Sequence, residues 1–366
     1  MAGTAAGESG TGGAADAGAA AATGAADVTC AAAGVRVAGA TGAAAGAGAR
    51  AAAAARGGAG RLPVRRLGRE ELADCLRLAR GRGWPAELRA WDLLFATGAV
   101  YGTAADDRGS GGNGNGNGNG SGGGSGSGGG RGLAGAVGVV RYGSAVTTIG
   151  GMLVAERYAG QGLGTRLLRH ALDRAPADTL WLTATGQGRP LYERFGFRDI
   201  GTLVRCSGTP RPPASSRTSR TSRTGEASRA AGPADLPGIA ALDGEVFGAD
   251  RSVLLRHLAA VAAQVRVVDG PRGPRGYAMA WDAVGTTAIG PVVADGPDTA
   301  VALLAGLAAR IEGPVRFDVG ADRGEVLAWA RDRGLGRAVS TTVMVHGRPL
   351  PGDRSRLFTP ATGALG

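Results

Sequence analysis

A glycine-rich turn at residues 160–164 is the segment of this chain with the clearest capacity for chemistry. Its three glycines stand at alternate positions, and the apolar spacing from Leu163 to Leu172 predicts a helix that begins directly after the turn. A turn of this kind aims backbone N–H groups and the positive end of the helix dipole at one point. Glycine also lets the backbone take positive φ and approach a ligand closely. The turn therefore predicts an anion site that fits a diphosphate.

Two flanking segments extend this pattern. Met152–Val154 predicts the end of an apolar strand before the turn, and residues 191–197 read Leu-Tyr-Glu-Arg-Phe-Gly-Phe after a short predicted strand at 179–183. Together these segments resemble the GNAT superfamily of acyl-CoA-dependent N-acyltransferases, in which a strand, turn and helix cradle the CoA pyrophosphate. The residues alone also fit an unrelated α/β domain whose helix has a glycine-rich cap.

The resemblance implies a set of site residues. The cofactor-binding residues it implies are Met152, Leu153, Val154, Ala159, Gly160, Gln161, Gly162, Leu163, Gly164 and Thr165. It also implies that backbone groups of Met152–Val154 bind the pantetheine arm and the thioester oxygen, and that the Tyr192 hydroxyl protonates the departing thiolate as general acid. The competing interpretation of Tyr192 is a tyrosine that packs in the core.

One position departs from the family pattern. Ala159 stands where arginine or glutamine is usual, so the backbone cradle is intact but one polar side chain is missing. Arg157 or Arg166 could supply the charge instead.

The general base cannot be read from the sequence. The predicted strand at 147–154 holds no carboxylate, and Glu156 on the following turn fits a solvated charge. A water relay, Asp92 and Glu87 stay open as alternatives. The aromatic residues Trp84, Trp91 and Phe95 fit either an apolar acceptor site or core packing.

Composition narrows the class of protein. The formal charge is +11 and every basic residue is arginine, which suits an acidic ligand such as CoA. Nucleic-acid binding is disfavoured because the arginines are scattered among acids and aromatic residues are few. Cys30, Cys75 and Cys206, like the three histidines, are isolated from one another, so we expect no metal site and no disulfide framework. No apolar run is long enough to span a bilayer and no signal peptide is recognisable, so we expect a cytoplasmic protein without membrane contact.

The chain divides into four parts by composition. Residues 1–60 are rich in Ala and Gly and predict a disordered tail. Residues 61–208 form the predicted acyltransferase domain, in which 109–130 are a flexible Gly-rich insertion at a hairpin tip. Residues 209–232 predict a solvated linker rich in Arg, Ser and Pro, and 233–366 predict a second domain. The first domain is expected to close with a final strand or pair at 197–206.

The second domain repeats the order of strands and helices of the first. The segments that start at Leu242 and Ile289, and a Phe-Thr-x-x-Thr run at 358–362, resemble the degenerate C-terminal domain of tandem GNAT proteins. Pro291 and Pro297 lack N–H donors where the first domain has its cradle, and Asp295 and Asp298 would repel a diphosphate. We therefore expect this domain to bind no CoA and to wall the substrate cleft.

The predicted fold class is α/β (α+β), a mixed central sheet flanked by helices, in two tandem GNAT copies. The predicted function is transfer of an acetyl group from acetyl-CoA to a primary amine of a small molecule or peptide. The alternative is a non-catalytic acyl-CoA-binding or sensing protein. A dinucleotide-binding domain is disfavoured because no acidic residue ends a following strand at the required separation. The acceptor, the acyl chain length and the oligomeric state stay open.

Overall fold

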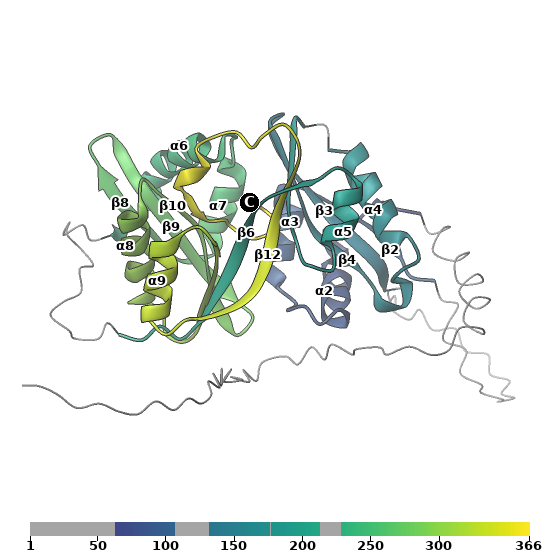
Figure 1. Ribbon diagram of the computed structural model, residues 1–366, viewed down its shortest axis with the longest axis horizontal. Helices are drawn as coiled ribbons and strands as arrows, with labels where there is room; N and C mark the ends of the chain where they lie inside the picture. Colours follow the sequence, from purple (N-terminus) through teal and green to yellow (C-terminus); the bar gives the residue numbers. More distant parts are fainter. Residues whose placement is uncertain (1–62, 107–131, 176, 213–227) are drawn as a thin grey trace, which may run out of the picture. The chain divides into compact units, whose positions relative to one another are not determined.

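The computed structural model describes residues 63–106, 132–175, 177–212 and 228–366. The tail expected at 1–60, the insertion expected at 109–130 and most of the expected linker lie outside the described residues. Figure 1 shows the described part as one continuous sheet with helices on both faces. The predicted fold class, a mixed sheet flanked by helices, is confirmed.

The elements of the N-terminal half include the predicted helix from Leu163 and the predicted strands at 147–154 and 179–183, with small shifts of their ends. The elements are β1 (Arg65–Arg66), η2 (Arg69–Glu71), α2 (Leu72–Gly81), α3 (Leu88–Thr97), β2 (Ala99–Ala104), β3 (Leu133–Tyr142), β4 (Val146–Val154), η3 (Glu156–Tyr158), α4 (Leu163–Asp173), β5 (Thr179–Ala184), α5 (Arg189–Arg194) and β6 (Arg198–Gly208).

The C-terminal half repeats this order of strands and α-helices and adds one short strand at its end. Its elements are β7 (Arg229–Ala230), η4 (Pro233–Asp235), α6 (Leu236–Phe247), α7 (Ser252–Val261), β8 (Ala262–Gly270), β9 (Gly273–Ala283), β10 (Thr286–Ala294), α8 (Pro297–Ala308), β11 (Val315–Gly320), α9 (Gly324–Asp332), β12 (Gly336–Gly347), η5 (Arg354–Arg356) and β13 (Leu357–Thr359).

Strand β7 lies inside the range that composition assigned to the linker. It pairs antiparallel with β8, and the Arg229 side chain bridges Asp235 and Asp269 with N–O distances of 2.7 Å to each. Composition missed this strand because its two residues are too few to show a periodic pattern. Residues 229–230 therefore belong to the sheet, while the linker itself stays a prediction.

Two strands are exchanged between the halves of the sheet. The strand order is β1-β2-β3-β4-β5-β12-β6-β11-β10-β9-β8-β7, and Figure 1 shows β6 and β12 side by side at the centre. Strand β12 pairs antiparallel with β5 on one side and with β6 on the other, while β6 also pairs with β11. The expectation that 197–206 closes the first domain is therefore wrong, because the strand next to β5 comes from the far end of the chain.

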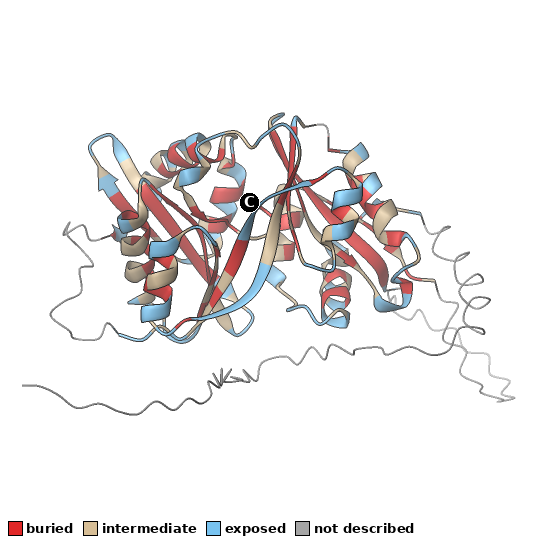
Figure 2. Cartoon of the chain, viewed as in Figure 1, coloured by how far each residue is buried: buried red, intermediate tan, exposed pale blue. Residues whose placement is uncertain are grey.

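Buried side chains gather in three cores on the faces of this sheet. One lies between the first half of the sheet and α4 with α5, and a second between the other half and α8 with α9 (Figure 2). The third joins α2 and α3 to α6 and α7, so both halves share it. In helix α4, Leu163, Leu167 and Leu168 are at most 1% exposed. Burial of each of these side chains contributes about 1.5–3 kcal/mol to the stability of the fold.

Candidate active site

The glycine-rich turn has the geometry of an open anion cradle. Gly160 and Gly162 take φ of 72° and 79°, in the left-handed region, and Gly162 caps α4 without any side-chain hydrogen bond. The hydrogen bonds of the helix begin at Arg166, whose backbone N–H donates to the Gly162 carbonyl at 3.1 Å. The preceding N–H groups, from Leu163 to Thr165, have no carbonyl within the helix to bind. They stay available for an anion.

The glycines of the cradle serve different purposes. A Cβ at Gly160 or Gly162 would meet no heavy atom within 4 Å, so these positions need glycine for their backbone angle and not for space. At Gly164 a Cβ would lie 3.5–3.7 Å from Leu191, Met152 and Val154, which is ordinary van der Waals contact. The structure thus brings the predicted strand end, the cradle and α5 together.

Strand β4 has a free edge beside the cradle. It pairs parallel with β5 only from Val146 to Thr148, and beyond that point the two strands diverge. Gly151 takes φ of 58°, and the register to β3 shifts between Gly150 and Leu153, which marks a β-bulge. Among the described residues no strand pairs with the β5-facing edge of Met152–Val154. Its backbone groups can therefore bind an extended ligand.

Of the cofactor-binding residues implied by the resemblance, Gln161 turns its side chain to another part of the turn and Ala159 is exposed. The Gln161 side chain donates to the Arg157 carbonyl at 2.7 Å, so it braces the turn from within. Ala159 is exposed and extended at the C-terminal end of η3. The Arg157 guanidinium lies over the Tyr158 ring, 5.0 Å from its centroid.

Tyr192 lies in α5 with its ring in the core of the first half. It is 8% exposed, and burial raises its pKa to about 12. The hydroxyl therefore stays protonated at neutral pH, as a proton donor must. Its ring meets the edge of Phe197 at 5.9 Å between centroids, and Phe197 in turn packs on His346 of β12 at 5.4 Å. A strand from the far end of the chain thus supports α5.

The candidate carboxylates are all ion-paired. Glu156 pairs with Arg82, and Asp92 pairs with Arg69. Glu87 pairs with Arg316 of β11 at 2.9 Å, which links the two halves.

Arg82 is a site residue that the sequence did not indicate. Besides Glu156, which follows β4, its guanidinium reaches the Gln187 side-chain oxygen, which follows β5, at 3.5 Å. It therefore spans the ends of the two strands that diverge. No local pattern identifies it, because its partners lie 74 and 105 positions further along the chain.

The aromatic residues proposed for an acceptor site separate into two groups. Trp91 is 5% exposed and its ring lies against the bulge, about 3 Å from where a Cβ at Gly151 would stand. It is a core residue behind the site. Trp84 is 46% exposed and is free to meet an acceptor.

In the second half, β10 and β11 diverge as β4 and β5 do in the first half, but another strand lies between them. Strands β10 and β11 pair parallel only at Thr287 and Ala288, and β10 has a register shift between Ile289 and Val292. Here β13 pairs with β10, placing Thr359 opposite Val292 and Leu357 opposite Val293. The edge that is free in β4 is therefore occupied in β10 by the chain itself.

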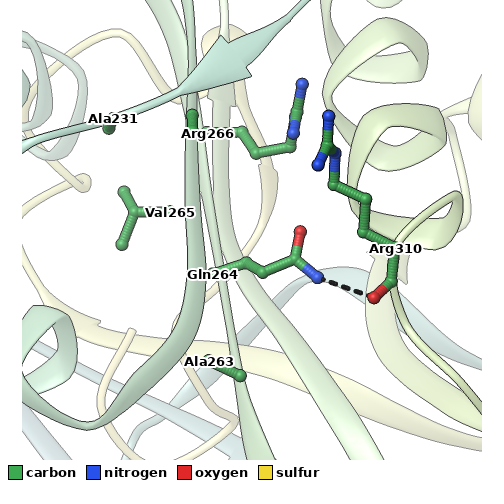
Figure 3. Close-up of a pocket in the computed structure, with 7 residues that line it drawn as sticks. Ala231, Ala263, Gln264, Val265, Arg266 and Arg310 are labelled. Carbon is green, nitrogen blue, oxygen red and sulfur yellow. Dashed lines mark hydrogen bonds between the residues drawn. The ribbon is translucent and has the colours of Figure 1, made fainter.

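Two surface hollows are lined by residues other than those of the cradle. Figure 3 shows one of them in the second half, where Arg266 and Arg310 point toward each other. Its polar groups serve neighbours: Arg266 Nε donates to Ser228 at 2.9 Å, and Gln264 donates to the Arg310 carbonyl at 3.1 Å. Another hollow lies between α2 and residues 155–157.

The residues that the structure describes hold no group of three or more His, Cys, Asp or Glu side chains arranged for a metal ion. None of their helices is long and apolar enough to cross a membrane.

Residues 125–197 match the acetyltransferase (GNAT) family, and residues 239–359 match an acetyltransferase (GNAT) domain. An uncharacterized N-acetyltransferase of Bacillus subtilis (strain 168), YitH, is 25% identical over 232 residues, which cover 63% of this chain and 80% of the relative.

Solved structures share the fold. A putative acetyltransferase from Pyrococcus horikoshii superposes with a TM-score of 0.64 at 19% identity, over 83% of this chain and 96% of its own. A tandem GNAT protein from the clavulanic acid biosynthesis pathway superposes with a TM-score of 0.51 at 13% identity, over 78% and 98%. The chain therefore belongs to the GNAT superfamily of acyltransferases and carries two GNAT domains in tandem.

Proposed function

We propose that this acyltransferase moves an acetyl group from acetyl-CoA to a primary amine of a small molecule or peptide. The observation that carries the proposal is the combination of a free β4 edge with an open helix N-terminus at its end. A diphosphate on the cradle leaves the pantetheine arm to run along Met152–Val154, where backbone groups are available for its amides. The thioester then lies near the bulge at Gly151.

Each proposed role follows from the chemistry of the step. The amine attacks the thioester carbonyl, the C–S bond breaks, and the thiolate leaves with the electron pair. A backbone N–H beside the bulge stabilises the oxyanion, because an aligned donor in a partly dry site costs no reorganisation. The Tyr192 hydroxyl donates the proton that converts the thiolate to free CoA. Water accepts the proton lost by the amine, and the tyrosinate regains a proton from that water, which restores the enzyme.

The proposal confines CoA to the first domain. Strand β13 takes the place along β10 that the pantetheine arm takes along β4, and the adjoining turn lacks a Gly-x-Gly pattern. The second domain then acts as a wall: it contributes β12 beside β5 and holds the chain end against the first domain.

Calorimetry and a turnover assay test the proposal together. Acetyl-CoA is titrated into the full chain, and thiol release is followed with a panel of amines and peptides. We expect one bound acetyl-CoA per chain and acceptor-dependent thiol release. Binding without release by any acceptor would point to the sensing alternative, and two bound molecules per chain would contradict a closed second site.

A further inference from the structure

The gap between β4 and β5 has a closed end built by the chain's last residues. The two strands are paired as far as Thr148 and Trp181, and Gly150 and Thr183 flank the point where they diverge. Residues 363–364 touch both strands there. Thr183 Oγ1 donates to the Gly363 carbonyl at 2.7 Å. A Cβ at Gly150 would stand 2.4 Å from the Ala364 Cβ, so the Ala364 methyl rests directly on β4.

Buried polar groups hold this segment in place. The Tyr142 hydroxyl donates to the Leu365 carbonyl at 2.6 Å, and Arg251 Nη1 donates to the Gly366 carbonyl at 2.5 Å. Arg251 and its partner Asp243 have fully buried side chains, and Asp243 also accepts from the Tyr277 hydroxyl. A buried ion pair with these additional partners has little freedom to shift, because any displacement leaves a charge unpaired.

The second domain therefore sets the floor of the gap in the first. Asp243, Arg251 and Tyr277 come from α6, the start of α7 and β9, whereas Gly150 and Thr183 belong to β4 and β5. A pantetheine arm that runs along β4 from the cradle toward the bulge directs its acyl group at this floor. Ala364, which is half-buried, contributes its methyl group, its Cα and its carbonyl oxygen to this floor, and the methyl group is the nearest of the three to a Cβ placed on Gly150.

We propose that Ala364 limits the acyl group of the donor to acetyl. The inference rests on the proposed function, since it takes acyl-CoA to lie along β4. One methylene added to the acyl chain needs about the volume of the Ala364 methyl, and the neighbouring backbone cannot retreat because Thr183, Tyr142 and Arg251 hold it. Removing that methyl creates the missing space.

The test compares acyl-CoA donors on Ala364→Gly, with Ala361→Gly as the matched control. Ala361 belongs to the same segment and is 3% exposed in the shared core, so its truncation loosens packing without opening the floor. Affinities of acetyl-CoA, propionyl-CoA and butyryl-CoA are measured by calorimetry, and kcat/KM is measured where an acceptor is known. We expect Ala364→Gly to shift the propionyl-to-acetyl ratio toward propionyl by about tenfold or more, the usual discrimination for one methylene.

The outcomes separate this inference from the function on which it rests. An unchanged ratio in Ala364→Gly, or an equal shift in Ala361→Gly, would overturn the acyl limit while acetyl transfer stands. Wild-type protein that binds propionyl-CoA and butyryl-CoA as tightly as acetyl-CoA would also overturn it. Failure of the wild-type protein to bind any acyl-CoA would overturn both proposals.

Discussion

Replacement of Gly162 by asparagine and by aspartate isolates the charge at the cradle. Both residues tolerate the left-handed backbone better than other L-residues, and a Cβ at this position meets no heavy atom within 4 Å. Each variant therefore loses a similar stability, about 1–2 kcal/mol from the backbone angle. Aspartate at a helix N-cap also favours the helix, so unfolding cannot explain a loss of binding by that variant alone.

The difference in affinity follows from Coulomb's law. An aspartate about 5 Å from a diphosphate with about two charges is repelled by about 2 kcal/mol at the dielectric constant of water and by about 7 kcal/mol at an effective value near 20. We therefore expect Gly162→Asp to bind CoA at least roughly 20-fold more weakly than Gly162→Asn.

Calorimetry of CoA binding at low and at high salt measures this difference. Salt should narrow the gap between the two variants, because the Debye length falls to about 3 Å at 1 M. Urea midpoints of the two variants serve as the folding control. Equal affinities for the two variants, or a gap that does not respond to salt, would refute the assignment of an anion site to this helix N-terminus.

Three further expectations concern the acid, the buried thiol and the exchanged strands. Tyr192→Phe should lower turnover by roughly 10²-fold or more while CoA affinity holds, and unchanged turnover in a thiol-release assay would remove Tyr192 from the mechanism. Burial raises the pKa of Cys75 to about 12, so its thiolate fraction at pH 8 is small and its alkylation should require unfolding. Peptide mass spectrometry measures the alkylation, and rapid labelling of the native protein would contradict this expectation. Residues 63–212 alone should not unfold cooperatively, because β12 separates β5 from β6 in the sheet. Co-expression with residues 228–366 should restore a folded complex on gel filtration. A stable isolated fragment would show that the exchange of strands is dispensable.

The sequence alone determined what depends on short stretches of chain. Helix α4 begins at Leu163 as predicted, because its apolar residues recur at helical spacing and Gly162 supplies the left-handed turn before it. The predicted residues of the cradle are contiguous, so their proximity follows from the chain itself. Their role in binding CoA stays a prediction.

Only the tertiary structure decided which strand lies beside which. Strands β6 and β12 have similar burial patterns, exposed at their first residues and more buried after them, and such a pattern does not state which neighbour is paired. Because β12 pairs with β5, the residues after it start close to both halves of the sheet. The chain then pairs β13 with β10 and places residues 361–366 beside β4 and β5. Arg82 likewise finds its partners only in the folded chain, and so do Glu87 and Arg316. These contacts join residues far apart in sequence, and short-range propensity and capping carry no information about them.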